Sequence, residues 1–502
     1  MILLWLIVLG GGFVFYWIQD ANRLKPELED LLETETGVKL RIGGDLAWRL
    51  WPPLSLVAHN VEADHQNQSW SIERLALDIS VASLLRNPGQ WVVQAISLSD
   101  AEMREDGDLL EVQSLTLQDF SPGVPAPVHS QIVYTPHGRA PVPLAMNGML
   151  TFDPAGKRLI AEGTRFETDL AEGTCDLSLA ARPTPSLRRP PATPAGATEL
   201  VPLALIREHD WAGTCDLSRL VLRGEPFTDV SANLSGQGSR AAIQLGFPRF
   251  LGGTADFRLN IDANNDPVLW TLKPDLTNVD SKRLLVWLGR PMQWLAPLAY
   301  GGTLRAEGST EAALIATLSG ETRLEGGQGS IDIAGVKQQI LAVATLLQAG
   351  ERIRRWPDVW EYQRLVGDWR IQRQHHLLDF KLDNLTVIAE GDYLPDPEEV
   401  DFAAELTFSN DPAFPVFDVD PLLFGLPIPV RCQGSVGNPT CRVDQQAAQR
   451  VVASALQNDE PTGLRGKLER KIEDEVPPEY QEAARSLLDI FSRSMQAKPG
   501  DN

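Results

Sequence analysis

Histidines, cysteines and clustered carboxylates are the residues of this 502-residue chain with the potential for chemistry, and their spacing matches no catalytic motif. The sequence contains no G-x-S-x-G nucleophile elbow, no H-E-x-x-H zinc motif, no Walker A loop and no G-x-G-x-x-G fingerprint after a strand. Of seven histidines, only His375 and His376 are adjacent. Neighbouring residues on a strand point to opposite faces, so these two cannot ligate one metal from that strand. We therefore expect exposed polar histidines and a protein that is not an enzyme, with no catalytic residue, metal or cofactor.

Two further groups of charged residues have weak chemical meaning. Glu102, Glu105, Asp106 and Asp108 loosely resemble a calcium site but lack the glycine and the ligand spacing of an EF-hand loop, so we expect solvated carboxylates. The basic-aromatic cluster Arg352, Arg354, Arg355 and Trp356 allows two interpretations. It contacts lipid phosphates at one end of a sheet, or it is a solvated helix terminus.

The four cysteines indicate whether the protein lies in an oxidising or a reducing compartment. Cys175 and Cys215 occupy the same position in two copies of the hexapeptide Gly-Thr-Cys-Asp-Leu-Ser, and Cys432 and Cys441 flank a Gly-Ser-Val-Gly-Asn-Pro turn. An even number of cysteines in two such pairs predicts the disulfides Cys175–Cys215 and Cys432–Cys441 in an oxidising compartment. The alternative is four buried thiols in a reducing cytosol.

The first residues predict a membrane anchor. Ile2–Ile18 is an uncharged run of 17 residues, which spans about 26 Å as a helix. A cleaved signal peptide is the alternative, but no basic stretch precedes the run and no A-x-A site follows it. We therefore expect residues 1–19 to stay in the mature protein as a single transmembrane helix.

The rest of the chain reads mainly as strands. Apolar residues alternate with polar ones in many short runs, and this period of two is typical of strands with one apolar and one polar face. Glycine and proline punctuate the runs, with 40 and 36 residues, which favours antiparallel sheets over α/β folds. We expect about 16 strands, which at about 4.8 Å between neighbours give a sheet about 75 Å long. Helical spacing appears at 21–36, 281–288, 336–347, 447–457, 463–474 and 478–495.

These patterns divide the chain into five parts. After the anchor we expect an N-terminal β region (20–180), a Pro-rich flexible loop or linker (181–202), a second β region with inserted helices (203–445) and a helical C-terminal tail (446–502). The repeated hexapeptide on both sides of the Pro-rich segment favours a loop within one sheet. A net charge of −22 argues against nucleic acid as a partner, because an acidic chain repels phosphates.

Residues 37–61, GVKLRIGGDLAWRLWPPLSLVAHNV, resemble the amino-terminal signature of the AsmA family of bacterial cell-envelope proteins. The matching positions are Gly37, Gly44, Leu46, Pro53, Leu54, Leu56, Asn60 and Val61. The segments 318–333, 384–393 and 426–439 are similar to later elements of that family. The likeness covers most of the chain and is strongest at 1–80 and 280–445.

The resemblance implies a fold and a function. The family's fold is an elongated, U-sectioned antiparallel β-sheet with an apolar inner face. The implied function is the transport or handling of phospholipids or other envelope lipids during outer-membrane biogenesis, from a single-pass anchor in the bacterial inner membrane with the bulk of the chain in the periplasm. Two alternatives stay open: a closed sandwich with an ordinary core, and a non-catalytic scaffold that assists outer-membrane protein assembly and binds envelope assembly proteins.

Three strands supply the residues that we expect to line the groove. Each set keeps a period of two, and we expect the sets to face one continuous apolar interior. The candidates for lipid contact are Leu75, Leu77, Ile79, Phe257, Leu259, Ile261, Leu378, Phe380 and Leu382.

Overall fold

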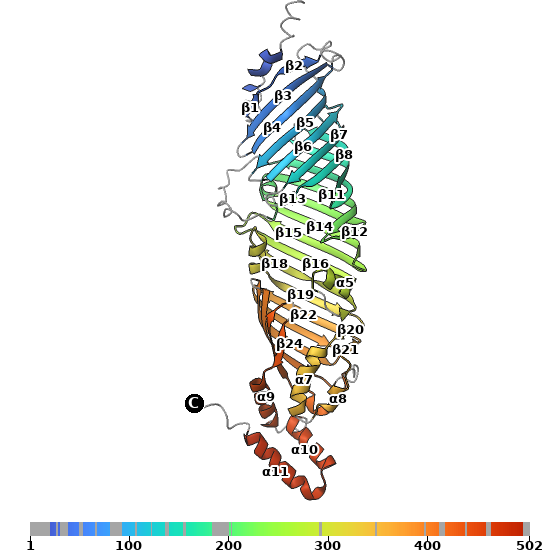
Figure 1. Ribbon diagram of the computed structural model, residues 1–502, viewed down its shortest axis with the longest axis vertical. Helices are drawn as coiled ribbons and strands as arrows, with labels where there is room; N and C mark the ends of the chain where they lie inside the picture. The colour runs from blue at the N-terminus through green and yellow to red at the C-terminus, as the bar shows by residue number, and fades with distance from the viewer. Residues whose placement is uncertain are drawn as a thin grey trace, which may run out of the picture. The chain divides into compact units, whose positions relative to one another are not determined.

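The structure is a computed structural model, and it consists mainly of antiparallel β-sheet (Figure 1). It describes residues 21–26, 29–30, 39–49, 54–65, 68–80, 93–105, 108–121, 123–135, 140–153, 157–182, 200–201, 203–290, 294–346, 349–395, 398–410, 417–436, 439–457 and 463–494. The chain forms two compact units. Unit 1 comprises 1–198 and 202–245, and unit 2 comprises 199–201 and 246–502. The boundary lies within strand β14 (Arg240–Phe250).

Unit 1 is a meander in which nearly every strand pairs antiparallel with the next. Strand β3 also pairs with β1 and β2, and β11 pairs with both β12 and β13. The strands are β1 (Lys39–Ile42), β2 (Leu46–Arg49), β3 (Leu54–His65), β4 (Gln68–Ile79), β5 (Val93–Glu105), β6 (Asp108–Gln118), β7 (Ala126–Thr135), β8 (Val142–Asp153), β9 (Arg158–Thr168), β10 (Ala171–Ala181), β11 (His209–Leu222), β12 (Glu225–Phe227) and β13 (Val230–Gln237).

Unit 2 holds a second antiparallel series, paired in the order β15, β16, β18, β19, β22, β23, β24, β25, β26 and β27, and a small sheet of β17, β20 and β21. The strands are β15 (Gly253–Asp262), β16 (Leu269–Asp280), β17 (Trp294–Leu295), β18 (Pro297–Glu307), β19 (Ser319–Gly326), β20 (Gly329–Asp332), β21 (Val359–Tyr362), β22 (Leu365–Gln372), β23 (His375–Leu382), β24 (Leu385–Pro395), β25 (Glu398–Phe408), β26 (Ile428–Ser435) and β27 (Thr440–Val443).

The described helices range from three to 17 residues in length. They are η1 (Ala21–Leu24), α4 (Leu203–Glu208), α5 (Ser281–Trp287), α6 (Glu311–Thr317), α7 (Ala334–Leu346), α8 (Glu351–Arg354), η2 (Pro421–Leu423), α9 (Gln445–Gln457), α10 (Leu464–Glu475) and α11 (Pro478–Ser494). The helices predicted at 281–288, 336–347 and in the tail are therefore confirmed. Half of the predicted 21–36 helix and the predicted anchor at 1–19 lie outside the described residues. Within the described part of the chain, no helix combines the length and apolarity needed to cross a bilayer.

The alternating sequence pattern explains the strands but undercounts them. About 16 strands were expected, whereas the described residues hold strands numbered up to β27. One reason is an extra residue at the same height in four neighbouring strands: Asn60 in β3, Glu73 in β4, Asp100 in β5 and Gln113 in β6. Each extra residue shifts the alternation by one, as in a β-bulge, so the apolar side chains beyond it return to the same face.

Both predicted disulfides are present. Cys175 and Cys215 lie directly opposite each other on β10 and β11 with a Cα–Cα distance of 4.1 Å, and Cys432 and Cys441 do so on β26 and β27 at 4.0 Å. The two hexapeptides pair antiparallel with each other. The strands that flank the Pro-rich segment are therefore neighbours in one sheet.

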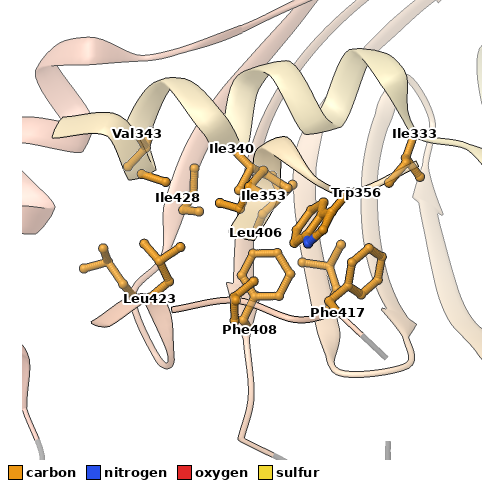
Figure 2. Packing of buried hydrophobic residues seen from close by; sticks show 14 of the residues in the cluster. Ile333, Ile340, Val343, Ile353, Trp356, Leu406, Phe408, Phe417, Leu423 and Ile428 are labelled. Atoms are coloured by element: carbon orange, nitrogen blue, oxygen red, sulfur yellow. The ribbon is translucent and has the colours of Figure 1, made fainter. Parts of the chain in front are cut away.

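The largest core lies in unit 2, where helices cover part of the sheet. Ile340 and Val343 of α7 and Ile353 of α8 pack onto Phe408 of β25 and Ile428 of β26 (Figure 2). Trp356 follows α8 and contacts Phe408 and Phe417, with ring centroids 5.9 and 5.0 Å away. Removing these side chains from water gives this end of unit 2 an ordinary close-packed core.

The C-terminal helix α11 forms two ion pairs with α10. Arg485 pairs with Glu473 of α10, and Asp489 pairs with Arg465 of α10 at 2.8 Å. On the other side, Tyr480, Leu487 and Ile490 are 62%, 66% and 62% exposed. Leu488 is the apolar residue of this helix that packs against the unit 2 core.

Candidate functional site

In unit 1, one face of the sheet is apolar from strand to strand. Leu77 of β4 lies opposite Leu56 of β3 and Ile96 of β5, and the row continues through Leu117 of β6 and Val128 of β7. Leu75 and Ile79 lie on the same face of β4. Further side chains of this apolar face are Leu98, Leu115, Ile132, Leu144, Met146, Leu150, Phe152, Leu159, Phe166, Leu177, Leu179, Trp211 and Leu217.

The opposite face of unit 1 is polar. Asp78, Ala76 and Arg74 of β4 pair with Ser55, Val57 and His59 of β3, and with small or hydroxyl residues of β5. The two faces of β4 therefore differ in polarity.

The apolar face of unit 1 is only partly covered by described residues. At its first strands, Ala21 of η1 packs with Ile42, Leu46, Leu56 and Ile79 in a small buried cluster. A second small cluster contains Leu117, Ala126 and Val128. Elsewhere several large side chains keep access to solvent. Leu75 and Leu77 are half-buried, and Phe152, Leu159 and Leu177 are 37–40% exposed.

In unit 2, Phe257, Leu259 and Ile261 also share one face of β15. They lie opposite Pro274, Leu272 and Trp270 of β16. Phe257 contacts Phe247 and Phe250 edge-on at 5.8 Å. Trp287 of α5 contacts Phe250 at 5.6 Å, so this helix adds an aromatic ring to the cluster.

Leu378, Phe380 and Leu382 mark a gradient of covering along β23. Leu382 is buried in the helix-covered core, Phe380 packs at its edge and is half-buried, and Leu378 is half-buried beyond it. The same face continues across β24, β25 and β26. All three sets of predicted groove residues thus occupy the apolar face of their own unit. That they line one common interior stays a prediction.

Charged residues of unit 2 gather on the polar face, where they pair with one another. Arg323 of β19 contacts Asp368 of β22 at 3.2 Å, and Arg431 of β26 binds Asp401 of β25 through two nitrogens at 2.9 and 3.1 Å. The Arg431 guanidinium lowers the pKa of the Asp401 carboxyl by hydrogen bonding. These exposed pairs contribute little to stability.

The histidine prediction is half wrong. His375 lies on the polar face as expected, within 3.0 and 3.1 Å of Glu390 and Asp392, whose hydrogen bonds raise the pKa of its ring. His376 points to the apolar face and is only 6% exposed. Burial lowers the pKa of the His376 ring. The signal was available, because His376 shares the parity of Leu378, Phe380 and Leu382.

The basic-aromatic cluster and the carboxylate cluster contain residues with structural roles. Trp356 is buried in the unit 2 core, Arg352 pairs with Asp418 at 2.7 Å, and Arg355 pairs with Glu351. Glu102 lies beside the extra residues of β3 to β6, in an open hollow with other carboxylates. No three His, Cys, Asp or Glu side chains among the described residues are arranged to hold a metal ion.

Comparison with known proteins gives one finding. No curated protein matches the sequence. The model of the AsmA family matches residues 1–111, which run from the first residue through strand β5 into β6. The resemblance to the AsmA family is therefore confirmed over residues 1–111.

Proposed function

We propose that this protein is a non-catalytic, membrane-anchored component of the bacterial cell envelope that binds the acyl chains of lipids along the apolar face of its sheets. It acts in the transport or handling of phospholipids or other envelope lipids during outer-membrane biogenesis. The bulk of the chain lies in the periplasm, held to the inner membrane by residues 1–19.

The observation that carries the proposal is the uncovered apolar face of unit 1. Large aliphatic and aromatic side chains form a strand-to-strand surface there, and many of them keep access to solvent. A soluble protein rarely exposes a broad apolar patch unless another molecule covers it. Acyl chains suit a face without charge or fixed polar pattern, because they need only apolar contact.

Two other observations support the cellular setting. The match to the AsmA family over residues 1–111 points to an envelope-related role. Two disulfides agree with an oxidising compartment such as the periplasm. The alternative function is a non-catalytic scaffold that holds envelope proteins during outer-membrane assembly, for which the exposed side of α11 offers an apolar surface.

Photo-crosslinking of the full chain in intact cells tests the proposal. A benzophenone amino acid at Leu75 or Leu378 reports on the apolar face. The same probe at Ala76 or Asp379, one residue further along the same strand, reports on the polar face and is a matched control. Mass spectrometry then identifies what each probe captures.

We expect lipid adducts from the two apolar-face positions and none from the two controls. Protein adducts without lipid from the apolar face would favour the scaffold. No adduct beyond the chain itself from any position would favour a closed core and refute the lipid proposal.

A further inference from the structure

His376 of β23 is a polar side chain in an apolar row. Directly opposite it lie Ile371 of β22 and Gly391 of β24, and Phe402 of β25 follows Gly391. The rings of Tyr393 and Phe402 contact the imidazole edge-on, with centroids 6.1 and 6.2 Å away. A buried polar group in such a setting is costly unless each of its polar atoms is bonded.

One of the two ring nitrogens has a partner, and this fixes the tautomer. The Trp369 Nε1–H donates to His376 Nδ1 at 3.0 Å. Burial lowers the pKa of the ring, so the ring is neutral. A neutral imidazole that accepts at Nδ1 carries its proton on Nε2.

That Nε2–H is a buried donor with no acceptor among the described residues. Tyr393 and Phe402, whose rings contact the imidazole, are only half-buried, so the rings that cover His376 are themselves accessible to a ligand on the apolar face. The cost of an unmade hydrogen bond at this position is recovered when an acceptor oxygen reaches it.

We propose that His376 Nε2–H is the hydrogen-bond donor for the ester carbonyl of an acyl lipid bound on the apolar face of unit 2. This inference rests on the proposed function and names the chemical group that this part of the face recognises. Trp369 is a positioning residue, because its indole N–H sets the His376 tautomer.

The surroundings select a neutral acceptor. The apolar face of β22 to β26 carries no lysine or arginine at its paired positions. A phosphate or a carboxylate at His376 would therefore be a buried charge without a counter-charge, which is strongly unfavourable. An ester carbonyl accepts a hydrogen bond without carrying a charge, and the attached acyl chain continues along the apolar row towards Leu378 and Phe380.

The test compares two lipids that differ only in this carbonyl. The full chain is offered vesicles of a diacyl phosphatidylcholine or of the dialkyl ether analogue with the same chain lengths, and the lipid bound per protein is measured. The wild type should prefer the ester by about fivefold to tenfold, the factor expected for one hydrogen bond. His376→Phe should lose the preference while it still binds the ether lipid.

Two control variants test whether the ester preference depends on the N–H donor of His376. His376→Gln retains an N–H donor and should keep part of the preference. His375→Gln changes the neighbouring residue on the polar face and should behave as the wild type. In the wild type, the ¹⁵N resonance of Nε2 should shift with the ester lipid and not with the ether lipid, which requires no substitution.

Three results would overturn the inference. Equal binding of both lipids by the wild type would show that His376 does not bind the ester carbonyl, and so would an ester preference that survives His376→Phe. Either result would leave the proposed function intact. Absence of lipid binding by the wild type would remove the proposed function and this inference together.

Discussion

A carboxylate placed on the apolar face distinguishes a lipid groove from a closed core. In Leu77→Asp, the substituted side chain lies between Leu56 and Ile96 on a half-buried position. Full burial of a leucine contributes about 1.5–3 kcal/mol, and Leu77 is only partly buried. The loss should therefore be about 1–2 kcal/mol, because the carboxylate keeps contact with water.

The same change in the helix-covered core should be far more damaging. Phe408 is 0% exposed and contacts Trp356 and Phe417. Truncating a buried phenylalanine costs about 3–5 kcal/mol, and an unpaired buried carboxylate adds several more. Phe408→Asp should approach or exceed the whole stability of a domain, about 5–15 kcal/mol.

Urea unfolding of the full chain, followed by limited proteolysis to distinguish the units, measures both effects. Ala76→Asp, on the polar face of the same strand, is the matched control and should change stability by less than about 0.5 kcal/mol. Leu77→Asp should also lower lipid capture by the probe at Leu75. If Leu77→Asp unfolded unit 1 as completely as Phe408→Asp unfolds unit 2, the apolar face of unit 1 would be a closed core and our reasoning would be wrong.

Three further predictions concern stability. Replacing both cysteines of the Cys175–Cys215 pair by serine should lower the free energy of unfolding by about 4 kcal/mol, and loss of the second disulfide by about 2.5 kcal/mol, because the closed loops span 40 and 9 residues; equal effects in denaturant unfolding would contradict the loop-length account. Gly367→Ala should destabilise unit 2, because a β-carbon there collides with the Phe380 ring, whereas Gly335→Ala in α7 has open space and should be neutral or stabilising in thermal melts. Buried His376 should make unit 2 lose stability as the pH falls below about 6.5, because the unfolded chain then takes up a proton that the folded ring refuses. His375 has the opposite effect, because Asp392 and Glu390 raise its pKa and the folded chain holds its proton more tightly. The difference between melts of the wild type and of His376→Gln isolates the His376 contribution, and a His376→Gln variant that retained the full acid loss would show that other groups cause it.

The sequence predicted the antiparallel sheets and their faces because a period of two is a local property. Leu75, Leu77 and Ile79 needed only their own strand to share a face, and the structure places them so. The disulfides were predictable for a related reason. Two copies of one hexapeptide have the same alternation, so their cysteines meet when the strands pair antiparallel.

Interruptions of the alternation explain why the sequence did not predict the number of strands. Asn60 and Asp100 have φ angles of 50° and 51°, in the left-handed region, and each resets the alternation within an otherwise regular strand. A reading that expects strict alternation ends the strand there, which contributes to too low a strand count. Asparagine and aspartate tolerate this conformation better than most residues, so their presence at a break in the period is the signal that was missed.

The lengths of the connections explain why the helix-covered core lies at one end of the unit 2 sheet. The insertions at 281–296, 327–364 and 409–427 all leave the sheet at the end marked by Leu298, Leu365, Leu382 and Phe408, and their apolar residues build the core above it. At the other end, β22 joins β23 through the two-residue turn at 373–374. The short helix α6 lies at that end too, but it buries none of its residues. His376 is one residue from the two-residue turn at 373–374, so the polar residue of the apolar row lies at this end, where the rings of Trp369, Tyr393 and Phe402 contact it.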